Sequence, residues 1–198
     1  VALKAYDRAV KACDRALAMA ENNAEAWRTK ADALRLWADD LEMLKKFTDA
    51  LAAVETALEL DSRDATAYAL RGAVLTKLGR REEAIRSFDE ALRLDESYHW
   101  AWKEKGKALY FHGNAQAALD LFVELSSSSD QFKSQSLAGR ILTLRALRQT
   151  EAADQLWRDS FGGPQQDADA YLKLARSFRE FNALSEALAA YREAIQAN

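Results

Sequence analysis

The feature that most constrains this chain is a repeat of about 34 residues. In the segment from Ala84 to Ser97, the aromatic residue Phe88 is followed three positions later by Ala91, and similar segments recur along the chain. The equivalent positions are Ala16, Ala57, Ala91, Leu125, Ser160 and Ala194. Their successive spacings are 41, 34, 34, 35 and 34 residues. A period of this size is the length of one helix–turn–helix unit, so we predict repeated helix hairpins.

The other half of each repeat carries a second pattern. An anchor such as Trp27 is followed four and seven residues later by Ala31 and Leu34. Residues at this spacing lie on one face of a helix. The equivalent anchors are Tyr68, Trp102, Leu137 and Tyr171. The middle position is usually Gly or Ala, which predicts that two helices cross closely there.

The composition favours helices throughout. Ala, Leu, Glu, Lys and Arg are abundant and are strong helix formers, whereas proline occurs once, at Pro164. The alternation typical of strands is nowhere sustained. We therefore predict an all-α fold in which neighbouring hairpins stack, because one hairpin cannot bury its apolar side alone.

The order of Trp or Tyr, a small residue, Leu, Ala, an aromatic residue and Ala resembles the tetratricopeptide repeat family over nearly the whole chain. The resemblance implies a right-handed superhelical solenoid of antiparallel helix hairpins with a concave groove that binds a protein partner. We expect one such domain over 1–198, as a fragment of a longer chain. Its expected parts are a half repeat, 1–21, and five repeats, 24–63, 65–97, 99–132, 134–166 and 168–198.

Several segments depart from this pattern. The first spacing is seven residues too long, which is about two helical turns, so we expect two extended helices there. The side chains expected to pack across their protruding end are Trp37, Leu41, Leu44 and Phe47. The serine-rich segment 126–136 predicts a helix break, and the segment 162–164, Gly-Gly-Pro, predicts a helix end.

The last repeat predicts an open apolar face. Its second helix carries Ala187, Leu188, Ala190, Tyr191 and Ile195 without a following cap. Solenoids normally need polar caps, because the faces at their ends are apolar. We expect this face to contact further chain or to mediate end-to-end homo-oligomers.

The sequence holds no persuasive catalytic or metal-binding constellation. His99 and His112 are isolated, whereas a zinc site needs several Cys or His ligands at short spacing. There is no glycine-rich phosphate loop, and Cys13 stands at a core position, where a structural thiol is expected. We therefore expect no enzyme activity, no catalytic residue, no metal and no cofactor.

Charge and cysteine content restrict the remaining classes. The net charge of −3 argues against a dedicated binder of nucleic acid or of a membrane surface. No apolar run reaches the roughly 18–20 residues of a membrane span. A single cysteine fits a reducing compartment, so we expect a cytoplasmic location.

The groove-facing stripe of each first helix predicts where a partner binds. It carries nine cations and five carboxylates, a net charge of +4. A concave wall of one sign concentrates its field, so the hypothesis is an acidic extended or helical peptide; the alternative is a solvated face with balanced ion pairs. The predicted groove residues are Arg28, Arg35, Leu70, Lys77, Lys103, Lys107, Tyr110, Arg145, Lys173, Arg176 and Arg179.

A second set of cations stands three residues after the anchors. Its members are Lys30, Arg71, Lys105 and Arg140. We expect their stems to cover apolar surface while the charged heads reach water, rather than to contact a ligand. Three functions follow from the whole: a protein-interaction scaffold, a structural self-assembly module, or a regulatory region attached to an enzyme in the parent protein.

Overall fold

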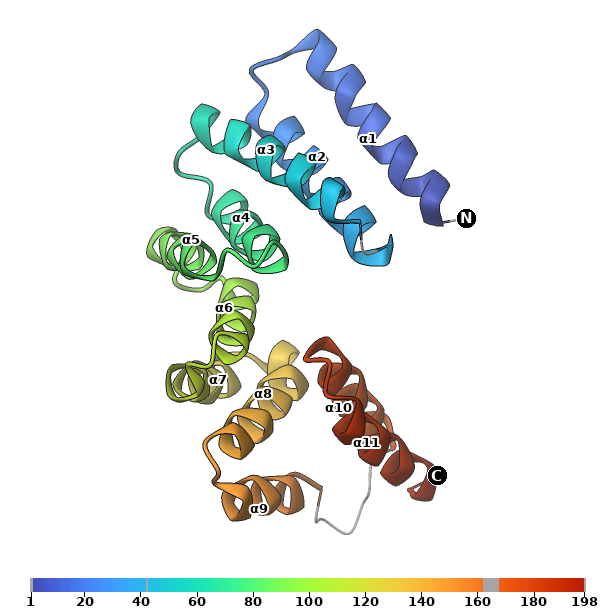
Figure 1. Cartoon of the computed structure of the whole chain (residues 1–198), viewed down its shortest axis with the longest axis vertical. Helices are drawn as coiled ribbons and strands as arrows, with labels where there is room; N and C mark the ends of the chain where they lie inside the picture. The colour runs from blue at the N-terminus through green and yellow to red at the C-terminus, as the bar shows by residue number, and fades with distance from the viewer. Residues whose placement is uncertain (1, 42, 162–167, 198) are drawn as a thin grey trace. The chain divides into compact units, whose positions relative to one another are not determined.

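The computed structural model of the protein describes residues 2–41, 43–161 and 168–197, and every regular element among them is helical (Figure 1). The elements are α1 (Ala2–Met19), α2 (Ala24–Leu41), α3 (Leu44–Leu60), α4 (Ala65–Lys77), α5 (Arg81–Leu94), α6 (His99–Phe111), α7 (Ala115–Ser128), the 3-10 turn η1 (Asp130–Phe132), α8 (Lys133–Ala146), α9 (Thr150–Phe161), α10 (Ala168–Glu180) and α11 (Leu184–Gln196). The predicted all-α fold is confirmed.

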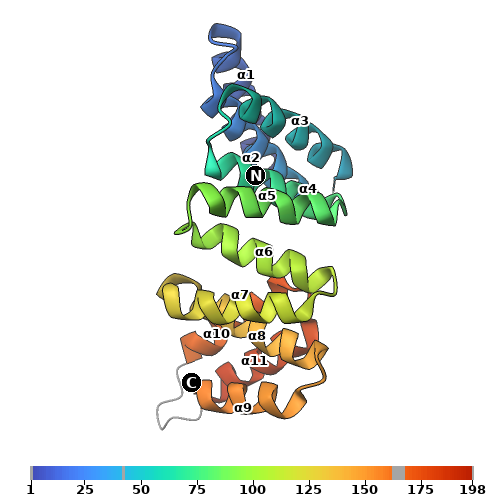
Figure 2. The same cartoon turned by 90° about the vertical axis from the view of Figure 1, so that its left-hand side faces the viewer.

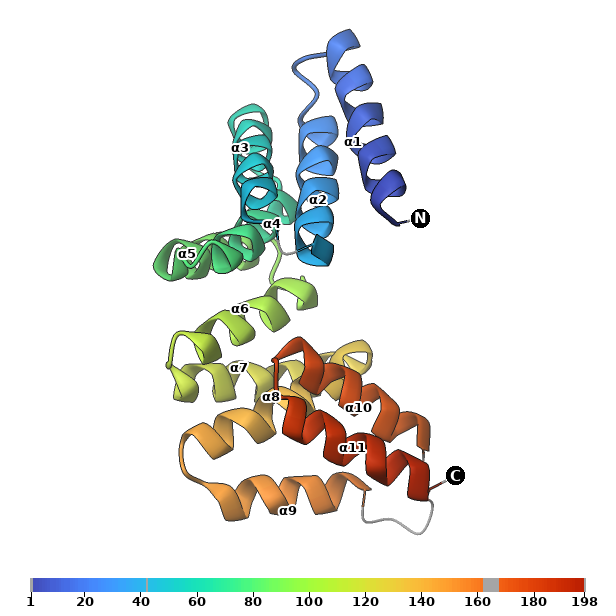
Figure 3. The ribbon, with the colours of Figure 1, turned by 45° about the vertical axis from the view of Figure 1, so that its right-hand side comes forward.

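The helices form two compact units, 1–101 and 102–198, called here the N-terminal and C-terminal units. In the N-terminal unit, α1 packs against α2, α2 against α3, α3 against α4 and α4 against α5, as Figure 3 shows for α1, α2 and α3. In the C-terminal unit, α7 packs against α8, α8 against α9 and α10, and α10 against α11. Figure 2 shows α8 and α10 behind α7. Each helix therefore buries one face against its neighbours.

Glycines at the small position of the repeat let aromatic rings approach the helix backbone. Phe88 of α5 is fully buried, and a Cβ atom added to Gly72 of α4 would lie 2.8 Å from its ring. Phe122 of α7 lies in the same way against Gly106, where an added Cβ atom would lie 2.7 Å from the ring. It also lies against Gly139, which stands two residues after the anchor Leu137 and not at the small position, and there the distance would be 2.6 Å. The close crossing predicted from the small residue has this structural basis.

The long first spacing lies in a pair of long helices. α2 and α3 have 18 and 17 residues, whereas α4 and α5 have 13 and 14. Phe47 is buried, and Trp37 is partly covered by Lys46, whose ammonium lies 4.3 Å from the ring centroid. Leu44 is 64% exposed, so the prediction that it packs was wrong. It is the first residue of α3, and the apolar face begins one turn later, at Phe47. The Leu41 side chain lies outside the described part.

The serine-rich segment 126–136 contains the predicted helix break, which lies at Ser129 and the turn η1 rather than at the first serines. α7 continues to Ser128, because the hydroxyls of Ser126 and Ser127 donate to the carbonyl oxygens of Val123 and Glu124, at 2.7 Å and 2.8 Å. Such back-bonding lets serine remain helical. The predicted helix end at 162–164 lies outside the described residues.

Candidate protein-binding surfaces

A cavity of about 330 Å³ opens on the predicted groove face of the N-terminal unit. We call it the N-terminal cavity. It is lined by Arg28, Thr29, Asp32, Arg35, Thr66, Leu70, Tyr98 and Trp100. Three predicted groove residues on α2 and α4 thus line one cavity. Trp100 lies on the groove-facing stripe, two residues before the anchor Trp102, whereas Tyr98 precedes α6 and lies outside the stripe.

The aromatic wall is formed by two neighbouring rings. The centroids of Tyr98 and Trp100 lie 5.9 Å apart. Burial raises the pKa of Tyr98, an effect partly opposed by a hydrogen bond with Thr66. The Tyr98 hydroxyl therefore stays protonated at neutral pH and remains a hydrogen-bond donor. Aromatic surface beside polar groups is typical of peptide-binding sites.

Asp64, the ion-pair partner of Arg28, also caps the N-terminus of α4. Its Nε atom lies 2.9 Å from Oδ2 of Asp64. The other oxygen of Asp64 accepts a hydrogen bond of 3.0 Å from the backbone N–H of Ala67 and so caps α4. The Asp64 carboxylate therefore caps α4 and also neutralises part of the positive charge that Arg28 brings to the cavity.

The other predicted cations of this unit are also paired. Arg35 lies 2.7 Å from Asp32 and 3.0 Å from Asp39, and the ammonium of Lys77 lies 2.7 Å from the second oxygen of Asp39. The stripe predicted as basic is therefore a network of both signs in the N-terminal unit, as the solvated-face alternative described. A bound carboxylate must share these cations with the protein's own.

In the C-terminal unit, four charged side chains form a compact cluster. Lys103 of α6 is 8% exposed, and its ammonium lies 3.0 Å from Glu104 and 3.3 Å from Glu180 of α10. The ammonium of Lys107 lies 3.2 Å from Glu104 and 3.9 Å from Glu180. The two lysines are thus matched by two carboxylates, one of them 77 residues away in the chain from Lys103.

The cluster shifts the pKa values of its own members. Burial lowers the pKa of Lys103, but the carboxylates of Glu104 and Glu180 outweigh this and hold the pKa above its ordinary value. Burial likewise raises the pKa of Glu104, and the ammonium groups of Lys107 and Lys103 outweigh it and hold the pKa below its ordinary value. Both partners are therefore charged at neutral pH.

Phe181 follows α10 directly and inserts among the aromatic side chains of α6 and α7. It is 3% exposed. Its ring centroid lies 5.8 Å from that of Tyr110, 6.4 Å from that of Phe111 and 5.6 Å from that of Phe122. The predicted groove residue Tyr110 therefore does make an aromatic contact, and the contact is to the chain itself.

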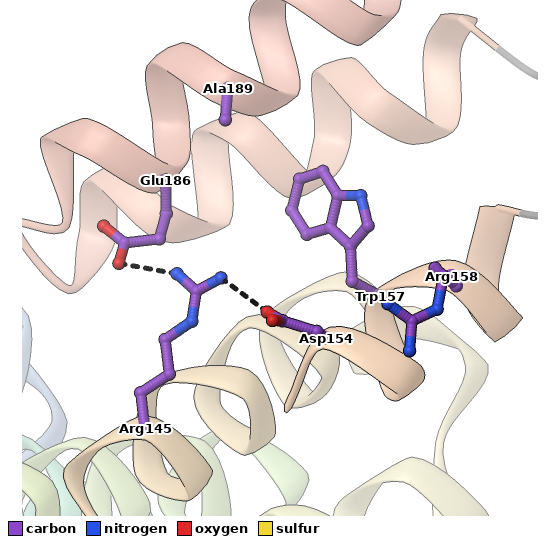
Figure 4. Close-up of a pocket in the computed structure, with 6 residues that line it drawn as sticks. All are labelled: Arg145, Asp154, Trp157, Arg158, Glu186 and Ala189. Atoms are coloured by element: carbon purple, nitrogen blue, oxygen red, sulfur yellow. Dashed lines mark hydrogen bonds and ion pairs between the residues drawn. The ribbon is translucent and has the colours of Figure 1, made fainter. Parts of the chain in front are cut away.

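Arg145, near the end of α8, joins α9 and α11 (Figure 4). Its guanidinium lies 3.3 Å from Asp154 and 2.8 Å from Glu186. Figure 4 shows Trp157 beside this bridge, in a cavity of about 280 Å³. The Trp157 ring stacks on Phe178 of α10, with centroids 6.0 Å apart. A further predicted cation is thus satisfied by the protein's own carboxylates.

The last three predicted groove residues, Lys173, Arg176 and Arg179, are exposed on α10. Lys173 lies 2.5 Å from Asp169, one turn earlier. None of the three lines either cavity described above. Lys173, Arg176 and Arg179 are therefore not part of either of these cavities.

Other kinds of site were sought in the described ranges. No group of three or more His, Cys, Asp or Glu residues there could hold a metal ion. Nor does any helix within these ranges have the length and apolar character needed to cross a membrane.

Comparison with known proteins identifies the repeat. A family model described as tetratricopeptide repeat matches residues 35–99 and 74–130. No curated protein matches the chain. Among solved structures, the chain is similar to YrrB, entitled a TPR protein with an unusual peptide-binding site, at 21% identity and a TM-score of 0.62, covering 96% of this chain and 94% of that one.

Two further structures have the same fold. A tetratricopeptide repeat protein from Parabacteroides merdae is 17% identical, with a TM-score of 0.65, covering 98% of this chain and 73% of that chain. The Cut9–Hcn1 structure, entitled an APC/C hetero-tetramer, gives 16% identity and a TM-score of 0.65, covering 98% of this chain and 37% of that chain. At these identities the likeness shows the fold alone.

Proposed function

The chain belongs to the tetratricopeptide repeat family, and from this premise we propose that it is a protein-interaction scaffold whose N-terminal cavity binds a partner segment with acidic and aromatic side chains. The family fold indicates protein binding in general. The chemistry of the partner is our inference from the cavity.

The observation that carries the proposal is the placement of Arg28 and Arg35 with Tyr98 and Trp100 around one cavity of about 330 Å³. A guanidinium offers a planar set of donors that matches a carboxylate. The aromatic wall can cover an apolar ring of the ligand. Because both arginines are already paired, we expect affinity to come from the aromatic contact and selectivity from the charges.

A direct test uses two fluorescent decapeptides and the full chain. One peptide alternates Glu with Phe, and the other replaces every Glu by Gln. We expect the acidic peptide to bind about tenfold more tightly by fluorescence anisotropy, with the difference shrinking as salt is raised. Trp100→Ala and Arg28→Gln should each weaken binding about tenfold, since truncating a central aromatic or arginine contact costs more than 1 kcal/mol.

The matched control is Arg63→Gln, which removes an exposed cation outside the cavity. It should bind like the wild type, and circular dichroism should show all variants folded. Equal affinity for the two peptides, or equal loss in Arg63→Gln and Arg28→Gln, would contradict the proposal.

Self-assembly is the second candidate function. Leu184, Leu188 and Ile195 are exposed at helical spacing on α11, and such a stripe can pack against a second copy. Light scattering should then show a mass that rises with concentration, and Leu188→Glu should abolish the rise. A mass that is constant over concentration would remove this candidate.

A further inference from the structure

The segment 180–186, called here the turn 180–186, runs from the last residue of α10 into the first turn of α11 and touches the predicted groove residues of the C-terminal unit. Glu180 lies within ion-pair distance of Lys103 and Lys107, Phe181 contacts Tyr110, and Glu186 contacts Arg145. These four partners were predicted, from sequence, to bind an acidic segment. In the structure an acidic and aromatic segment of the same chain lies there.

The contacts of this segment combine two ion pairs with one buried aromatic ring. One carboxylate lies 3.3 Å from the ammonium of Lys103, the next residue buries a phenyl ring, and a second carboxylate lies 2.8 Å from the guanidinium of Arg145. Charge and ring contacts alternate over only seven residues, 180–186. A partner segment with this pattern would find the same donors and the same aromatic surface.

We propose that the surface formed by Lys103, Lys107, Tyr110 and Arg145 is a second binding site for an acidic-aromatic partner segment, and that the turn 180–186 occupies it until such a segment displaces it. This inference deepens the proposed function, because it assigns the same class of partner to the C-terminal unit. It uses no residue of the N-terminal cavity.

The contacts of the turn are of a kind that a competitor can exchange. In each ion pair one side chain is accessible to water and salt: Glu180 is 35% exposed beside Lys103 at 10%, and Arg145 is 36% exposed beside Glu186 at 18%. A tethered segment has an effective concentration in the millimolar range, so a free peptide of the same sequence competes poorly with it. Weakening the tethered copy raises the fraction of chains that can bind the free one.

The test adds a fluorescent peptide with the sequence of residues 178–188 to the full chain. The target variant is Glu180→Gln with Glu186→Gln, which removes both charges and keeps the shapes. We expect the peptide to bind this variant about tenfold more tightly than the wild type, because the internal competitor is weakened. A peptide carrying the same two substitutions should bind about tenfold more weakly.

Glu151→Gln, which removes an exposed carboxylate on α9, is the matched control and should bind the peptide like the wild type. Lys103→Gln in the target variant should abolish binding. Equal affinity of the peptide for wild type and target variant would overturn the proposal. So would binding that is lost in Arg28→Gln but kept in Lys103→Gln, a result that would leave the N-terminal cavity as the binding site.

Hydrogen exchange gives a second reading that does not depend on a substitution. Saturating peptide added to the wild type should speed exchange of amides in α10 and α11 and leave α4 unchanged, because a displaced turn loosens its own helices. Peptide binding with unchanged or slower exchange in α10 and α11 would overturn displacement.

Discussion

The carboxylate of Glu180 lies 3.3 Å from the ammonium of Lys103, although 77 residues separate them in the chain. Glu180 is the last residue of α10, and Lys103 is in the first turns of α6. The contact links predicted repeats that are not adjacent in sequence. It makes the cohesion of the C-terminal unit depend on the ionisation of a few side chains.

Acid should therefore weaken this unit. The pKa of Glu104 is lowered in the folded protein, so its stabilising effect is complete above its ordinary pKa of about 4.3 and is lost as pH falls through the lower folded value. The pKa of Lys103 is raised, so its contribution is complete below its ordinary pKa of about 10.4 and is lost as pH rises through the higher folded value. We expect a stability plateau between about pH 5 and pH 10.

Urea denaturation at each pH measures this plateau. Glu104→Gln should lower the free energy of unfolding at pH 7 by about 1–3 kcal/mol, because it leaves two ammonium groups with one carboxylate. It should also flatten the acid limb. Asp7→Asn, which removes an exposed pair with Lys11 at 2.8 Å, should cost less than about 0.5 kcal/mol. Acid limbs of equal slope in wild type and Glu104→Gln would refute the assignment.

The contact between Gly72 and Phe88 gives a packing prediction. Gly72→Ala places a methyl group 2.8 Å from the Phe88 ring, so we expect a loss of about 1–3 kcal/mol despite the better helix propensity of alanine. In the Phe88→Leu background the same substitution should cost much less, because the clashing ring is gone. Thermal denaturation of the four proteins forms a double-mutant cycle, and additive losses would show that the ring is not the cause.

A third prediction concerns the cations three residues after each anchor. Lys30 lies 2.7 Å from Asp14, and Arg71 lies 3.5 Å from Glu55. Each cation thus pairs with a carboxylate on the preceding helix, while its stem is partly buried. The expectation that these residues serve packing rather than a ligand stays a prediction.

Arg140 interrupts this series. Val123 stands where Asp14 and Glu55 stand in their repeats, and the Arg140 guanidinium has no ion-pair partner within the described part of the chain. Burial lowers the pKa of Arg140, and Val123 is 46% exposed. Val123→Glu should therefore raise the free energy of unfolding by about 0.5 kcal/mol.

Thermal denaturation would detect this gain against Val123→Gln, which is equally polar but uncharged. The advantage of Glu over Gln should shrink in high salt. If the two variants have the same melting temperature at low salt, Arg140 does not lie within reach of position 123.

The sequence was sufficient for the helices and for the small-residue contacts, because both depend on local periodicity. Gly72 and Phe88 meet at the spacing that the repeat predicts. The turns were less predictable: Arg148 and Asn182 have positive φ where Gly79 and Gly113 stand in earlier repeats. Non-glycine residues tolerate this conformation only when the surrounding structure holds it, which composition does not show. The repeat boundaries stay a prediction.

The sequence was enough to predict which charged residues lie on the groove stripe of the C-terminal unit. It was not enough to predict which of them form ion pairs with one another. Lys103 and Lys107 are predicted groove residues, and Glu104 and Glu180 are two of the five carboxylates on the same stripe, but a sum of charges cannot show that they neutralise one another. That requires α10 to lie near α6, which depends on side chains such as Phe181 that have no special place in the repeat. Periodicity describes neighbouring repeats and carries no information on contacts between distant ones.

Asp64 has two structural roles: its carboxylate caps α4 and forms an ion pair with Arg28. A visiting carboxylate that takes over the guanidinium would leave Asp64 still engaged by the amide of Ala67, so the exchange of one anion for another need not unravel the start of the helix. A ligand carboxylate can therefore replace Asp64 as the ion-pair partner of Arg28 while the N-terminal cap of α4 stays in place. Binding and release at this cavity would then leave the fold of the N-terminal unit intact.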